Sequence, residues 1–105
     1  MNLGLREHPE AAAELDAAVE WYEAREPGLG IGLIEQIEAA QRRVLDVPNA
    51  WPRFPGWDRL PLVRTAKVEV YPYRIVYVVR SQGIVVLAYA HTSRQPGYWR
   101  HRHDS

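Results

Sequence analysis

Hydrophobic residues recur at two spacings along this chain, and each spacing predicts a different kind of element. From about residue 9 to residue 46, apolar side chains return every three or four positions, as in helices that bury one face. Pro9 suits the first turn of a helix, residues 27–30 (PGLG) interrupt the pattern, and Pro48 ends it. Two helices joined by so short a connection form an antiparallel hairpin. The predicted buried stripes are Leu15, Ala18, Val19 and Tyr22 in the first helix, and Leu33, Ile37, Ala40 and Val44 in the second.

Beyond Pro48 the apolar residues alternate or run together, which predicts strands. Three segments have this character, VRTAKVEV, YRIVYVVR and IVVLAYAH, and residues 2–7 form a further short edge strand. The pattern therefore predicts an α+β fold in a single domain, residues 1–105. An N-terminal helical hairpin packs on one face of a small, mainly antiparallel sheet of three or four strands, and a short C-terminal helix or tail follows.

The positions of two turns predict which residues share a face of the sheet. If the turns are centred on residues 71–72 and 81–82, Lys67 lies opposite Val76, which in turn lies opposite Leu87. One face is then almost uninterruptedly apolar and should receive the helical hairpin. The residues of this face are Leu62, Ala66, Val68, Val70, Ile75, Tyr77, Val79, Ile84, Val86 and Ala88.

The other face is apolar in its middle and charged at one end. Its apolar part needs a cover, which is either the tail of the chain or another protein. We interpret it as a groove for a helix or an added strand of a partner. Arg64 falls on the hairpin side in this register. The residues of the predicted groove are Val76, Val78, Val85 and Leu87.

Two irregular segments flank the predicted sheet. Residues 51–57 (WPRFPGW) are rich in aromatic rings, and we interpret them as a lid over one end of the core. The alternative is a surface for stacking or for docking a partner. Residues 101–104 (HRHD) are interpreted as a frayed tail, whose histidines lack the supporting scaffold of a metal site. We expect neither a metal nor a cofactor.

The net charge of zero hides an uneven distribution. Residues 1–48 carry ten acidic and four basic side chains, and residues 49–105 carry three acidic and nine basic ones, nearly all of them Arg. A basic half of this kind suits nucleic acid, the ribosome or an acidic partner segment. The absence of cysteine excludes disulfides and thiolate metal sites. No apolar run approaches the length of a membrane helix, so a cytoplasmic protein is expected.

Cationic and proton-exchanging side chains gather toward one end of the predicted sheet. Lys67, Arg74 and His91 share a face there, and Arg94 and Tyr98 follow the last strand closely enough to fold over it. Guanidinium groups hold a phosphodiester and stabilise the extra charge of its transition state. In RNA the 2′-hydroxyl itself attacks phosphorus, so cleavage needs only a base and an acid, for which His91, Tyr98 and Lys67 are the candidates. The set suits RNA cleavage without a metal.

Four segments in this order resemble the RelE/ParE superfamily, the toxins of bacterial type II toxin–antitoxin modules, also called plasmid-stabilisation proteins. The segments are AxxELxxAxxWYE, PGLG, YPYRIVY and HTSRQPGYW, and the resemblance covers about residues 9–102. It implies a sheet with a helical hairpin on one face. It also implies a partner antitoxin that neutralises the toxin.

The resemblance implies site residues as well. The catalytic positions of RelE-like members match Arg74, Lys67, Arg94 and Tyr98, whereas a second lysine of that site falls at Thr65 and is absent. His91 fits relatives that use a histidine. Further RNA contacts would come from Arg64, Arg80 and Arg100.

Three functions follow from this resemblance. The first is an endoribonuclease (mRNA interferase) that cuts mRNA in the ribosome and inhibits translation. The second is a ParE-like inhibitor of DNA gyrase that binds without catalysis. The third is a degenerate member that only pairs with its antitoxin. In each case the antitoxin would occupy the apolar groove, and its acidic residues would meet the arginines.

Overall fold

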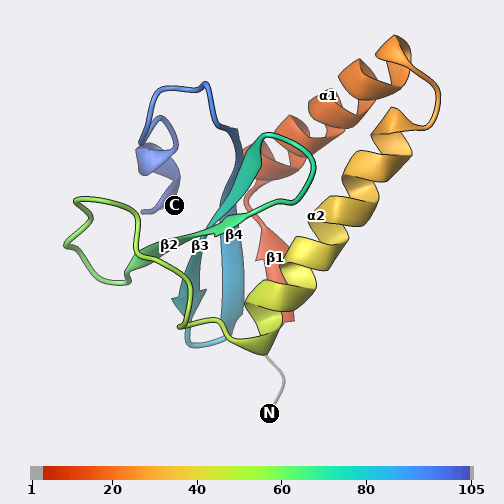
Figure 1. Cartoon of the computed structure of the whole chain (residues 1–105). Helices are drawn as coiled ribbons and strands as arrows, with labels where there is room; N and C mark the ends of the chain where they lie inside the picture. The colour runs from red at the N-terminus through yellow and green to blue at the C-terminus, as the bar shows by residue number, and fades with distance from the viewer. Residues whose placement is uncertain (1–3, 105) are drawn as a thin grey trace.

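Two helices lie against one face of a four-stranded sheet, and two irregular segments lie against the other (Figure 1). This arrangement comes from a computed structural model that describes residues 4–104. Residues 2 and 3 of the predicted first strand lie outside the described residues. The elements are β1 (Gly4–Glu7), α1 (Pro9–Arg25), α2 (Leu29–Asp46), β2 (Val63–Lys67), β3 (Tyr73–Arg80), β4 (Gly83–His91) and a 3-10 helix, η1 (Arg100–Arg102).

The helical hairpin begins and ends where the sequence predicts. Pro9 opens α1, and the imidazole of His8 caps it by accepting a hydrogen bond from the Glu10 N–H. At the tip of the hairpin the Glu23 carboxylate accepts hydrogen bonds from the N–H groups of Gly28 and Gly30, which satisfies the first turn of α2. The predicted stripe of α2 is confirmed as buried: Leu33, Ile37, Ala40 and Val44.

The strands follow the order β1-β4-β3-β2, with β1 parallel to β4 and the other pairs antiparallel. The predicted fold class is therefore confirmed. Lys67 lies opposite Arg74 rather than Val76, a shift of two residues that leaves each side chain of β2 on its predicted face. The strand ends at Lys67, and Val70, predicted to be in the core, is exposed in the following turn with a positive φ of 72°.

A β-bulge interrupts the pairing of β3 with β4. Val76 lies opposite Ala88, but the next residue, Tyr77, lies opposite Val86, so Leu87 has no partner of its own. Because of this extra residue, Leu87 and Ala88 both join the core on the second face, and Tyr89 turns to the hairpin side. The predicted pairing of Val76 with Leu87 is wrong for this reason.

The sheet separates two hydrophobic cores. Seven of the ten predicted hairpin-side residues lie in the first core, under α1 and α2, while Ala88 and Leu62 belong to the second and Val70 to neither. The seven are Ala66, Val68, Ile75, Tyr77, Val79, Ile84 and Val86.

Candidate functional site

The second face of the sheet is covered by the chain's own segments. Trp57 from the loop after α2 and Trp99 from the C-terminal segment are both buried, and Phe54 packs its ring edge-on against Trp99 at 4.9 Å. The aromatic loop is thus a cover, as the lid interpretation expects, but it covers the second face of the sheet rather than one end of the core. The predicted partner groove lies beneath these rings with its residues at most 7% exposed, so it is closed in this structure. These residues are Val76, Val78, Val85 and Leu87.

The C-terminal segment is held in place by a half-buried carboxylate of α1. Glu14 accepts a hydrogen bond from the Tyr98 hydroxyl at 2.6 Å and pairs with the Arg102 guanidinium at 3.0 Å. The side chain of Arg102 is only 6% exposed and also donates to the carbonyl of Leu87, at the bulge. The interpretation of residues 101–104 as a frayed tail is therefore wrong.

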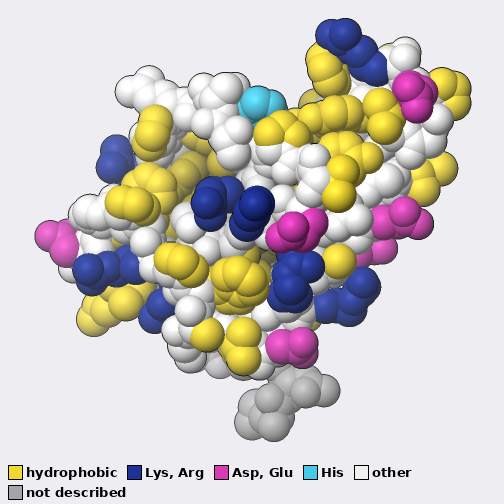
Figure 2. All heavy atoms as spheres, in the orientation of Figure 1, with side chains coloured by type: hydrophobic (Ala, Val, Ile, Leu, Met, Phe, Trp, Pro, Cys, Tyr) yellow, Lys and Arg dark blue, Asp and Glu magenta, His cyan; other side chains and the backbone are white. Residues whose placement is uncertain are grey.

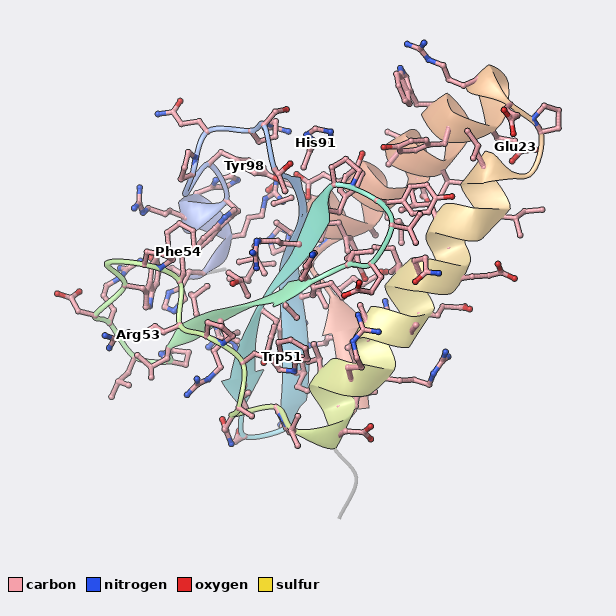
Figure 3. All side chains as sticks on the ribbon, in the orientation of Figure 1. Glu23, Trp51, Arg53, Phe54, His91 and Tyr98 are labelled. Atoms are coloured by element: carbon pink, nitrogen blue, oxygen red, sulfur yellow. The ribbon has the colours of Figure 1, made fainter. Side chains whose placement is uncertain are left out.

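His91 does not share a face with Lys67 and Arg74. The bulge turns the end of β4 over, so that the His91 ring packs edge-on against Tyr73, 5.2 Å away, on the side of α1. Its Nδ1 lies 2.7 Å from the Ser93 hydroxyl. Figure 3 shows His91 at the upper end of the sheet, between the C-terminal segment and α1. The predicted common face is wrong, yet His91 still lines a pocket of about 160 Å³ with Arg74, Arg94 and Tyr98, whereas Lys67 is not part of its lining.

Tyr98 is committed to structural contacts. Burial, together with the hydrogen bond that its hydroxyl donates to Glu14, raises the pKa of Tyr98 above its ordinary value. The guanidinium carbon of Arg94 lies 3.8 Å from the centre of its ring, a cation–π contact. The hydroxyl is therefore a poor acid, and Arg94 occupies one face of the ring on which a base would stack.

Lys67 and Arg74 remain exposed, on adjacent strands and directly opposite each other. Thr65, which stands where nuclease relatives carry a second lysine, is buried, and its backbone N–H donates to Pro52. Two of the predicted cations, Lys67 and Arg74, therefore lie together at this end of the sheet. At the position of the missing second lysine, Thr65 offers only a buried hydroxyl.

The three arginines predicted as RNA contacts lie in different places. Arg64 is on the hairpin side, as its register predicts, and donates to the carbonyl of Trp51 at 2.7 Å. Arg80 donates to the carbonyl of His103 and so anchors the C-terminal segment. Arg100 is exposed.

A cleft of about 540 Å³ brings Arg100 and Arg74 together with Arg53, a residue that the sequence analysis did not single out. We call it the arginine cleft. On the face shown in Figure 2, Lys and Arg side chains gather near the middle beside hydrophobic ones. The only sequence signal for Arg53 was its place within the aromatic loop. The cleft is lined by Pro52, Arg53, Phe54, Pro55, Thr65, Arg74, Pro96 and Arg100.

This lining suits the binding of an anion and supplies no side chain for proton transfer at neutral pH, because its only ionisable groups are guanidiniums. Within residues 4–104 no three His, Asp or Glu side chains come together as metal ligands. In the same part of the chain, no helix is both long and apolar enough to cross a membrane.

Comparison with models of protein families shows which family this chain belongs to. The model for the ParE toxin of the type II toxin–antitoxin system parDE matches residues 5–96. The chain belongs to the ParE toxin family. Its fold is similar to that of a solved structure described as the chromosomal ParDE TA system from P. aeruginosa, with a TM-score of 0.71 and 24% identity over 87% of this chain and 97% of the other. A search of the curated proteins finds no match.

Membership of the ParE family confirms the resemblance to the RelE/ParE superfamily. It implies an antitoxin partner, because the family is by its description the toxin of a toxin–antitoxin system. It does not distinguish mRNA from gyrase as the target.

Buried tyrosines predict how the stability of this ParE-family toxin depends on pH. Burial raises the pKa of Tyr77 to about 12, and burial also raises the pKa of Tyr89 and of Tyr98. The unfolded chain releases these protons near the ordinary tyrosine pKa of about 10, before the folded protein does. We therefore expect the free energy of unfolding to fall as the pH rises from about 10 to about 12 and above.

The measurement is denaturant unfolding across this pH range, beside tyrosinate absorbance of the folded protein. Tyr77→Phe should remove part of the slope, because it removes one of the tyrosines whose pKa burial raises. Complete tyrosine ionisation of the folded protein at about pH 10, without loss of stability, would contradict the expectation.

Proposed function

We propose that this ParE-family protein inhibits DNA gyrase by binding it, without catalysis, and that a cognate antitoxin neutralises it. One observation carries the proposal: the Tyr98 hydroxyl, expected to supply the acid for RNA cleavage, donates instead to the Glu14 carboxylate, and its pKa is raised. The match to the ParE model fits this choice at least as well as it fits a nuclease.

Cleavage of a phosphodiester requires an acid and a base within hydrogen-bond reach of the reacting oxygens. His91 and Tyr98 line a small pocket with Arg74 and Arg94. The Tyr98 hydroxyl, however, donates to Glu14, and the His91 ring packs against Tyr73. Arg74 and Arg100 line a cleft that holds no carboxylate, histidine or phenol. This arrangement favours binding over bond cleavage.

A ribosome-dependent mRNA endonuclease is the second candidate. It is favoured by Lys67, which lies directly opposite Arg74 and is exposed. In this account Lys67 would act as the base or add charge at the scissile phosphate, but the acid would need another source.

We place the antitoxin on the outer surface of the helical hairpin, because the groove predicted for it is closed by the chain itself. Three large apolar side chains are exposed there: Trp21, Ile31 and Ile34. Exposed apolar residues on adjacent helices offer area to a partner helix.

The experiment induces the chain alone in bacteria and follows growth, a DNA-damage reporter and mRNA ends. We expect growth arrest with DNA damage and intact mRNA. Tyr98→Phe and His91→Gln should arrest growth as well as the parent chain, because neither group takes part in binding gyrase. If either variant loses toxicity at normal protein level, or if mRNA is cut without DNA damage, the endonuclease is the better account. If the parent chain has no effect on growth, the protein only pairs with its antitoxin.

A further inference from the structure

We infer that the arginine cleft binds the phosphate backbone of DNA. The biological setting of this inference rests on the proposed function, because gyrase acts on DNA and a toxin bound to gyrase lies near that DNA. The binding itself is a property of the toxin alone and is tested without gyrase.

The positive charge of the cleft is not balanced by carboxylates. Arg59 and Arg102 have carboxylate partners, but no ion pair joins Arg53, Arg74 or Arg100 to any described residue. These three come from the loop after α2, from β3 and from η1, and they line one cleft without a carboxylate in it. Like charges repel, so this convergence suits a ligand that carries several negative charges.

Two of the cleft arginines stand at positions that the fold defines closely. Gly97 has a φ of +81°, and a Cβ at this position would lie 2.6 Å from the guanidinium carbon of Arg100. The tight turn before η1 therefore accommodates the Arg100 side chain against its backbone. Arg74 is fixed on a central strand, and exposed Lys67 opposite it continues the basic surface. The strand and the turn fix where the backbones of Arg74 and Arg100 stand, so the cleft does not have to assemble on binding.

The surroundings of the cleft favour nucleic acid over an acidic peptide. An extended peptide would bind by adding a strand to β2, but the chain's own loop already occupies that edge: Phe54 N–H donates to Val63, and Thr65 N–H donates to Pro52. The prolines of the lining have no N–H to offer. What remains for recognition is guanidinium forks, which suit phosphate oxygens and need no backbone partner.

The test measures binding of a fluorescent DNA duplex to purified toxin by anisotropy, over a range of salt concentrations. The variant replaces all three cleft arginines, Arg53→Gln, Arg74→Gln and Arg100→Gln, which are exposed and should not alter folding, as checked by circular dichroism. The loss of three phosphate contacts should weaken binding at least about ten-fold at low salt. The slope of log binding constant against log salt concentration should become less negative by about 2.7.

A matched control variant loses the same number of positive charges, but at positions outside the cleft. It carries Arg6→Gln, Arg25→Gln and Arg42→Gln, at three exposed positions away from the cleft. Binding by the control should stay within about two-fold of the parent protein at the salt of the cell, where charges far from the ligand are screened.

Equal losses in the two triple variants would overturn the inference, because binding would then follow net charge alone. Tighter binding of an acidic peptide than of a duplex of equal charge would assign the cleft to a protein partner, and tighter binding of single-stranded RNA would assign it to RNA. Both results also overturn it. A toxin that binds DNA through the cleft but leaves gyrase unaffected would refute the proposed function while the cleft stands.

Discussion

Replacing Trp99 with alanine should lower the free energy of unfolding by about 4 kcal/mol, since a fully buried indole is lost and the cavity collapses only in part. Trp99 contacts Phe54 and Trp57 of the loop and covers the second face of the sheet. Its loss therefore loosens both segments that close this face. Urea unfolding followed by circular dichroism measures the change.

The control for Trp99 is Trp21→Ala, because Trp21 is 53% exposed at the tip of the hairpin. We expect this change to cost less than about 1 kcal/mol. Equal losses at the two positions would show that the second face is not a core on which stability depends.

The second large effect is expected at Arg102. In Arg102→Met the carboxylate of Glu14 loses a partner at 3.0 Å and the carbonyl of Leu87 loses a donor, both in a largely buried place. Breaking such a pair should lower the free energy of unfolding by about 3 kcal/mol. Glu14→Gln in the same chain should restore part of the loss, because the uncompensated charge is then gone.

An exposed ion pair provides the comparison for Arg102. Arg59 lies 3.7 Å from Asp104 with both side chains more than half exposed, so Arg59→Met should cost less than about 1 kcal/mol. If Arg102→Met were as mild as Arg59→Met, the C-terminal segment would not be anchored through Glu14.

The elements that repeat a simple period were predictable from the sequence. The stripe of α2 and the alternation in β2 and β3 place most side chains on the observed face, and the predicted hairpin lies on the predicted side of the sheet. The two-residue error in pairing Lys67 was harmless, because side chains alternate with a period of two.

The bulge in β4 was not predictable from the same pattern. Residues 84–90 (IVVLAYA) are apolar almost throughout, so an extra residue at Leu87 leaves no mark in the alternation. A strand buried on both faces loses the signal that would fix its register. This error in register also affected the predicted site, because the residues after Leu87, including His91, were predicted on the wrong face of the sheet.

The prediction for the C-terminal segment was wrong for another reason. A run such as HRHD has the composition of solvent-exposed chain, and burial of Arg102 depends on Glu14, which lies 88 residues earlier. Arg53 was overlooked likewise, because its neighbours in the cleft come from distant segments. Contacts of this kind are set by the tertiary fold and not by local spacing.

These corrections change the account of function. The sequence predicts one reactive set of Lys67, Arg74, His91, Arg94 and Tyr98. In the structure all but Lys67 line one small pocket, but the Tyr98 hydroxyl donates to Glu14 and the His91 ring packs against Tyr73. What remains is a basic surface suited to binding. Such a surface accords with the proposal of a toxin that acts by binding.

The most direct test of this account adds purified toxin to DNA gyrase with a relaxed plasmid, and in parallel to translating ribosomes with a defined mRNA. The account predicts that supercoiling falls as toxin is added in proportion to gyrase, while the mRNA stays intact. Unchanged supercoiling together with cleavage of the mRNA in the ribosome would contradict it.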